Sequence, residues 1–246
     1  MTPAEAVALC VHGESLWHRL GLSALGVGWE ERDGVARRTG DAVVVFLGAM
    51  TLDASATAAQ LDAAVRGLSG RVMVRDSFAV LDLAPLGWRR WRMHPWMLRE
   101  PVPVAEPRVE GLEVRPVTTS DEVRLFERTI FAAADGDPDW APAGSVHPAP
   151  QTLHVPGLTL FLAWLDGEPV GTALAAVDAR VVQVSAVSVK EPARRRGVGT
   201  ALTAACVALH PGLPAVLDST DLGHGVYRGL GFGDVGESVL WERPAA

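Results

Sequence analysis

The second half of the chain alternates apolar runs with amphipathic segments. Runs typical of strands are predicted at 112–117, 158–165, 168–178, 181–189, 214–218 and 238–241. Asp166-Gly167 separates two of these runs and is typical of a hairpin turn. Thr119-Ser-Asp-Glu122 forms a capping box, which predicts that a helix begins there.

Two further helices are predicted later in this half. One follows residue 197, where a single apolar stripe is formed by Leu202, Ala205, Cys206 and Leu209. A short helix is predicted over 221–229. Strands interleaved with helices predict an α/β (α+β) fold, in which helices cover both faces of a mixed sheet.

The first half repeats this order in a weaker form. Residues 41–47 are predicted as a strand and residues 55–68 as a helix. Two short segments also correspond, in the sequences Leu86-Gly-Trp88 and Leu230-Gly-Phe232. We interpret the first half as a degenerate copy of the second. An unrelated α/β cap is the alternative.

A proline-rich segment separates the two halves. Three prolines within residues 101–107 prevent regular structure there. The predicted organisation is an N-terminal domain at 1–101, a linker at 102–111 and a C-terminal domain at 112–246. A length of 246 residues suits two modest domains.

The composition indicates which classes of partner and which cellular location to expect. The net charge of −7 gives no overall basic field for nucleic acid, and the basic run at 88–92 is interpreted as a solvated strand end. No apolar stretch reaches about 18 residues, so no membrane partner is expected. Cys10 and Cys206 give neither a disulfide framework nor a metal-binding spacing, and a cytoplasmic location is expected.

The turn between the strand at 181–189 and the next helix has the chemistry of an anion site. Arg194, Gly197 and Gly199 form an R-x-x-G-x-G pattern there. Glycines allow close approach of a ligand to the backbone, and the first N–H groups of a helix have no helical partner. The helix dipole favours a phosphate at that end. Neither the dinucleotide fingerprint nor the P-loop pattern is present. The alternative is a plain glycine turn with solvated arginines.

Two landmarks in the right order resemble the GNAT N-acetyltransferase superfamily. Val189-Lys-Glu-Pro192 and Arg194-Arg-Arg-Gly197-Val-Gly199 resemble its acyl-CoA loop, and Val226-Tyr-Arg-Gly-Leu-Gly-Phe232 resembles its L-Y-x-x-x-G-F motif. The resemblance implies two GNAT-like mixed-sheet α/β sandwiches in tandem. The segment 48–55 of the first half lacks R-x-x-G-x-G, so we expect cofactor binding only in the second half.

The resemblance implies acetyl-CoA as cofactor and a set of residues that hold it. These residues are Val187, Ser188, Val189, Arg194, Arg195, Arg196, Gly197, Val198, Gly199 and Thr200. Tyr227, the only tyrosine, stands where the family places the general acid that protonates the departing thiolate. A tyrosine that only packs in the core is the alternative.

The general base does not follow from the resemblance. Gln183 occupies the position where some relatives carry a glutamate, and an amide cannot accept the proton. His224 and Asp218 are candidates, and a water chain or an amine that arrives neutral would need no base residue.

An acidic loop precedes the strand at 158–165. Asp135, Asp137, Asp139 and Trp140 would form a lid suited to a cationic amine. A solvated turn is the alternative interpretation.

The predicted function is acetyl-CoA-dependent acetylation of a primary amine on a small molecule or peptide, by direct attack in a ternary complex. No metal is expected, and homodimer formation stays open. A non-catalytic acyl-CoA-binding regulatory module is the rival from another class. A mycothiol-synthase-like role is a further alternative, because that enzyme is also a tandem GNAT protein.

Overall fold

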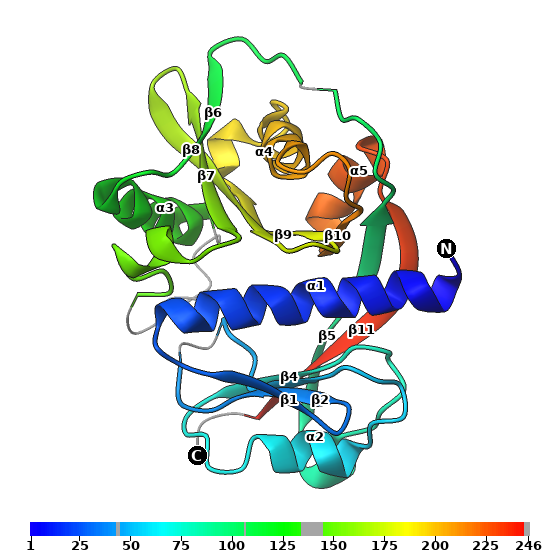
Figure 1. The fold of residues 1–246 in the computed structure, drawn as a ribbon. Coiled ribbons are helices and arrows are strands. Elements are labelled where there is room, and N and C mark those ends of the chain that lie inside the picture. Colours follow the sequence, from blue (N-terminus) through cyan, green and yellow to red (C-terminus); the bar gives the residue numbers. More distant parts are fainter. Residues whose placement is uncertain (43–44, 106, 134–144, 244–246) are drawn as a thin grey trace.

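A computed structural model describes residues 1–42, 45–105, 107–133 and 145–243 (Figure 1). Asp135, Asp137, Asp139 and Trp140, predicted to form a lid, lie outside the described residues. The strands form one sheet in the order β1-β2-β3-β4-β11-β5-β10-β9-β8-β7-β6. The fold is therefore the mixed α/β class that the sequence predicts.

The elements are as follows. The strands are β1 (Trp29–Arg32), β2 (Val35–Arg38), β3 (Ala49–Thr51), β4 (Val72–Asp76), β5 (Arg89–Arg99), β6 (Leu112–Pro116), β7 (Leu158–Leu165), β8 (Glu168–Val177), β9 (Val182–Val189), β10 (Ala215–Asp218) and β11 (Gly233–Arg243). The α-helices are α1 (Pro3–Ala24), α2 (Ala58–Ala64), α3 (Ser120–Ala133), α4 (Val198–Ala208) and α5 (Asp221–Gly229). Short 3₁₀ turns are η1 (Ala84–Leu86), η3 (Gln151–His154) and η4 (Glu191–Ala193).

The two halves exchange their last strands. β5 pairs antiparallel with β10 of the second half, and β11 pairs antiparallel with β4 of the first half. β5 and β11 also pair with each other at the centre of the sheet. The predicted boundary at residues 102–111 therefore follows a strand that belongs to the sheet of both halves, and β5 and β11 join the two lobes in Figure 1.

The exchanged strands begin in the same way. A helical element precedes each strand, η1 before β5 and α5 before β11. A glycine with positive φ follows each helical element, Gly87 with φ of 84° and Gly231 with φ of 88°. A non-glycine residue is strained in that conformation. The next residue is a buried aromatic side chain in both cases, Trp88 and Phe232. This correspondence was visible in the sequence, whereas the exchange was not.

Helices cover both faces of the sheet. On one face α1 and α3 pack over side chains such as Trp96, Leu174 and Val216. On the opposite face α4 and α5 cover the second half and α2 covers the first. Figure 1 shows α1 running across the middle of the molecule, over strands of both halves.

The long helix α1 was not predicted, and it packs through glycines. A Cβ atom on Gly13 would lie 2.6 Å from both Gln183 Oε1 and Val216 Cγ2. A Cβ atom on Gly21 would lie 2.5 Å from the ring of Phe46. The two glycines therefore let the helix backbone approach the sheet more closely than any other residue would.

The first half departs most from the predicted elements. Of the strand predicted over residues 41–47, the described residues 41–42 and 45–47 form no strand, and β3 begins at Ala49. The helix predicted from residue 55 begins at Ala58. Thr57 caps α2: its Oγ1 accepts a hydrogen bond from the Gln60 N–H, and the Thr57 N–H donates to Gln60 Oε1. This capping box defines the start of the helix. In the second half β7 and α5 have the predicted bounds, and the predicted Thr119–Glu122 capping box is present.

Candidate active site

The turn between β9 and α4 has a backbone that favours glycine. Gly197 is the N-cap of α4 and has φ of 81°, and Arg195 has φ of 61°. The loop is anchored at its start, where the Lys190 N–H donates to the Val170 carbonyl at 2.8 Å. The chain therefore reaches the helix through a tight, left-handed turn.

The N–H groups at this end of α4 are open. In the part of the chain that the structure describes, those of residues 195–200 have no hydrogen-bond partner, and no side chain caps the helix. A Cβ atom added to Gly199 would meet only Val189 Cγ2, at 3.8 Å. Protein packing therefore does not require a glycine there, whereas a bound anion close to the backbone would.

The arginines of the loop differ in their surroundings. Arg194 Nε donates to the Val189 carbonyl at 3.0 Å, and Nη2 donates to the Ala133 carbonyl at 3.1 Å. The guanidinium of Arg194 thus braces the loop against the ends of β9 and α3. Arg196 is half exposed and lies 3.7 Å from Asp166. Cofactor contacts by Arg194, Arg195 and Arg196 stay a prediction.

β9 carries a bulge just before the loop. Its pairing with β8 moves from Ser185 opposite Leu174 to Ser188 opposite Thr172, which leaves one extra residue on β9. Within this bulge Ala186 has φ of 54°, and its carbonyl accepts from Thr172 Oγ1 at 2.9 Å. A bulge bends and twists the strand that holds it.

β9 and β10 separate next to this bulge. Their parallel pairing joins only Val182 to Ala215 and Gln183 to Val216. Beyond these pairs, the described residues give β9 no strand partner on the β10 side. The predicted cofactor residues Val187, Ser188 and Val189 lie on this open stretch, directly before the N–H groups of the α4 turn.

Tyr227 lies in α5 on the α4 side of the sheet. Its side chain is 8% exposed and packs edge-on against Phe232, with ring centroids 6.1 Å apart. Burial, with the added negative charge of Asp218, raises the pKa of Tyr227 well above its usual range. Among the described residues the phenol oxygen has no hydrogen-bond partner. The phenol is therefore protonated at neutral pH and available as a donor.

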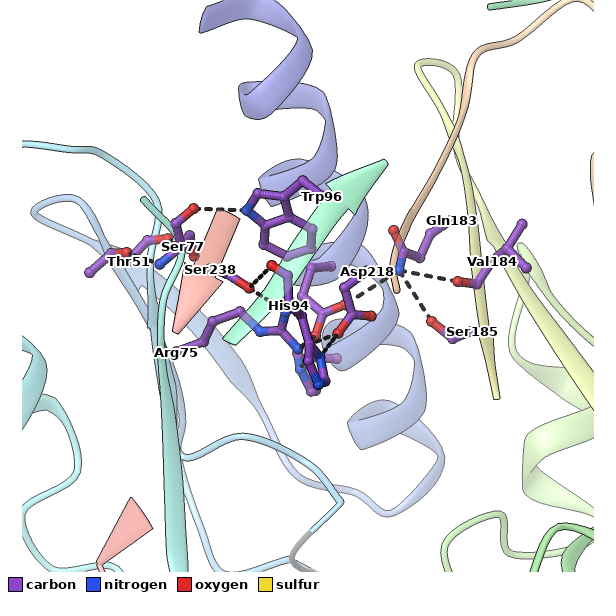
Figure 2. A network of polar contacts seen from close by, with 12 residues as sticks. Thr51, Arg75, Ser77, His94, Trp96, Gln183, Val184, Ser185, Asp218 and Ser238 are labelled. Atoms are coloured by element: carbon purple, nitrogen blue, oxygen red, sulfur yellow. Dashed lines mark hydrogen bonds and ion pairs between the residues drawn. The ribbon is translucent and has the colours of Figure 1, made fainter. Parts of the chain in front are cut away.

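A polar network lies between the sheet and α1, at the centre of the molecule (Figure 2). We call it the central network, and it consists of Glu14, His18, Arg75, His94, Gln183 and Asp218. Arg75 Nη2 lies 3.1 Å from Glu14 Oε1 and 3.0 Å from Asp218 Oδ2. His94 Nδ1 lies 2.7 Å from the same oxygen of Asp218. Figure 2 shows Arg75 and His94 both directed toward Asp218.

Asp218 is ionised within this network. Burial by itself would raise the pKa of its carboxyl, but the charge of Arg75 and the contact with His94 outweigh it and hold the pKa well below its usual range. The carboxylate therefore accepts from Arg75 and His94 across the neutral pH range. Asp218 was a sequence candidate for the base, and its partners Arg75 and His94 were not.

Gln183 belongs to the same network. Its side chain is fully buried, and Nε2 donates to Glu14 Oε2 at 3.3 Å and to Ser185 Oγ at 3.2 Å. The position where relatives carry a glutamate thus faces a glutamate supplied by α1. Sequence reasoning missed Glu14 because α1 itself was not predicted.

His224, the other predicted base candidate, lies elsewhere. Its Nε2 is 2.8 Å from Asp234 Oδ1, and Arg228 contacts the other oxygen of that carboxylate at 2.9 Å. His224 lies in α5 with its side chain 36% exposed, and its partner Asp234 lies at the start of β11. Among the described residues, His224 makes no contact with the central network. The structure therefore separates the two candidates.

The family model of the acetyltransferase (GNAT) family matches residues 124–232. The match includes the α4 loop, the bulged strand and Tyr227. The second half of the chain therefore carries a segment similar to the GNAT acetyltransferase domain, as its two sequence landmarks predicted. A comparison with curated proteins finds no match.

Solved structures with a similar fold extend over almost the whole chain. A GCN5-related N-acetyltransferase from Kribbella flavida is 20% identical with a TM-score of 0.66, and the match covers 97% of this chain and 96% of that one. A GCN5-related N-acetyltransferase-like protein from Streptococcus suis is 12% identical with a TM-score of 0.58, covering 98% and 100%. A tandem GNAT protein from the clavulanic acid biosynthesis pathway is 16% identical with a TM-score of 0.52, covering 77% and 68%. At these identities the likeness concerns the fold.

The described part of the chain contains no group of three or more potential metal ligands. None of the helices within the described ranges is both long and apolar enough to cross a membrane.

Proposed function

We propose that this protein is an acetyl-CoA-dependent N-acetyltransferase that acts on a primary amine of a small molecule or peptide. The observation that carries the proposal is the row of open N–H groups at residues 195–200, which follows a bulged strand separated from its neighbour. A chain of this shape offers a polar cradle for a pyrophosphate and an open strand edge for an extended amide-containing arm.

The residues fit such a cofactor in two ways. The N–H groups of Arg195 to Thr200 would hold the pyrophosphate, and Gly199 leaves the space that a side chain would fill. The backbone of Val187 to Val189 would pair with the pantetheine arm. When bound, acetyl-CoA would supply the acyl group as a thioester.

Tyr227 would serve as the general acid. Its raised pKa keeps the phenol protonated, and its oxygen is free to donate to a departing thiolate. Attack by the amine in a ternary complex requires no nucleophilic residue. Cys10 and Cys206 are both buried, and burial raises the pKa of each thiol, so neither suits a covalent intermediate.

The test is release of the CoA thiol from acetyl-CoA in the presence of spermidine, glucosamine or an alanine-initiated peptide. We expect turnover with at least one of these amines and none with an alcohol or thiol of similar size. Acetyl-CoA binding without amine-dependent thiol release would support the rival, a non-catalytic acyl-CoA-binding module. Acetylation of the alcohol in preference to every amine would contradict the proposal.

A further inference from the structure

We propose that His94, oriented by Asp218, accepts the proton of the attacking amine. This inference rests on the proposed acetyl transfer, and it places the base on a strand of the first half. His94 would then replace the carboxylate that is missing at Gln183.

The strand register places His94 beside the end of β10. Asp218 pairs with Trp96 of β5, and the Ser219 N–H donates to the Pro95 carbonyl at 3.0 Å. Alternation along the strand puts His94 on the same face as Trp96, which is the α1 face. Asp218 lies on that face too, two residues beyond Val216. His94 and Asp218 therefore meet where β9 has already separated from β10.

The contact with Asp218 determines which nitrogen of His94 carries the proton. An ionised carboxylate can only accept, so Nδ1 is the donor at 2.7 Å, and in the neutral form of the ring the lone pair is therefore at Nε2. Within the described residues Nε2 has no hydrogen-bond partner, and the side chain keeps 13% of its surface exposed. The acceptor nitrogen is therefore reachable, as a general base requires.

Further charged groups surround the pair formed by His94 and Asp218. Arg75, from β4, contacts Asp218 and donates to Ser238 Oγ at 3.0 Å. Glu14, from α1, contacts the same Nη2 of Arg75 that contacts Asp218, and His18 of α1 contacts Glu14. The negative charge of Asp218 would stabilise the imidazolium that forms when His94 takes a proton.

The other candidates are less suited to accept a proton. Glu14 is 4% exposed and is occupied by Arg75, His18 and Gln183. Asp218 is occupied by Arg75 and His94. We therefore assign Asp218 a positioning role and His94 the catalytic one.

Two residues, His94 and Tyr227, account for every proton transferred in the reaction. The lone pair of the amine nitrogen forms the new N–C bond, and the C–S bond of the thioester breaks with its electron pair going to sulfur. The proton of the amine passes to His94 Nε2, and the phenol proton of Tyr227 passes to sulfur. The imidazolium then releases one proton to water and the phenolate takes one up.

The variant that isolates this role is His94→Asn. The Asn amide N–H can take the place of Nδ1–H and donate to Asp218, so the network keeps its hydrogen bond, but no group remains at the position of Nε2. We expect kcat/KM for the best amine of the panel to fall by roughly 10²–10⁴-fold. The affinity for acetyl-CoA measured by calorimetry should be unchanged. His224→Asn is the matched control, because that histidine also contacts an aspartate but lies outside the network.

The kinetic parameter that changes separates a catalytic from a structural role. The loss in His94→Asn should fall on kcat, with the KM for acetyl-CoA and the unfolding transition both unchanged. A variant with wild-type kcat/KM, or one whose loss falls on the KM for acetyl-CoA, would overturn the assignment while leaving acetyl transfer intact. A wild-type protein without turnover on any amine of the panel would overturn the proposed function and this inference together.

Discussion

Tyr227 has features of both a packing residue and a catalytic residue. Its ring is buried against Phe232, yet its hydroxyl has no partner among the described residues, although a buried tyrosine hydroxyl usually finds one. A ligand would supply that partner. The pair Tyr227 and Phe232 could be identified from sequence because the L-Y-x-x-x-G-F spacing is local. The charge of Asp218 acts on the Tyr227 phenol. The contact between Asp218 and His94 could not be predicted from sequence, because these two residues are 124 positions apart.

Replacement of Tyr227 by Phe tests the proton-donor role. The substitution removes only the hydroxyl, so the buried ring is retained and folding should be little affected. We expect kcat to fall by roughly 10²–10⁴-fold with acetyl-CoA affinity little changed. Steady-state kinetics with the best amine of the panel provide the measurement. A Tyr227→Phe protein with the wild-type rate would reduce Tyr227 to a packing residue.

At the level of the element, α1 organises the site from the first half of the chain. It supplies Glu14 and His18 to the central network, and its glycines bring the helix against β9 and β10. Sequence periodicity did not identify this helix because many of its buried positions hold polar or small residues instead of large apolar ones. The second half was predictable because its strands are continuous apolar runs between clear turn residues.

Close packing of α1 gives a stability prediction. Gly13→Ala places a methyl group 2.6 Å from Gln183 and Val216, so the sheet or the helix must shift. Gly225→Ala, inside α5, meets no atom within 4 Å. Both substitutions gain about 1 kcal/mol of helix propensity, so the difference between them isolates the packing cost, which should be about 1–3 kcal/mol. Chemical denaturation measures both variants, and equal stabilities would show that α1 does not pack this closely.

At the level of the whole molecule, the exchange of β5 and β11 makes the halves interdependent. Among the described strands, β11 pairs with β4 and β5 alone, and both of these belong to the first half. The sequence correspondence at 86–88 and 230–232 indicated a repeat, but hydrophobic patterns do not show which strand pairs with which. The division into separate domains therefore could not reveal that the sheet is continuous.

Separate expression of the halves tests this interdependence. A fragment of residues 102–246 would lose β5 and leave β11 without a described strand partner, so we expect it to be unfolded or aggregated. Co-expression with residues 1–101 should restore a complex that binds acetyl-CoA. Circular dichroism and calorimetry provide the measurements. A fragment 102–246 that folds and binds acetyl-CoA alone would show that the exchanged strand is dispensable.

The central claim is that one acetyl-CoA binds each chain, at the α4 turn of the second half. Calorimetric titration of the wild-type protein, Gly199→Trp and Gly212→Trp tests it most directly. An added Cβ atom meets no atom closer than 3.8 Å at either glycine, so we expect both variants to fold, but only residue 199 lies in the proposed pyrophosphate site. We predict one equivalent bound by the wild-type protein and by Gly212→Trp, and no measurable binding by Gly199→Trp. Unchanged affinity in Gly199→Trp, or two equivalents bound per wild-type chain, would contradict the account.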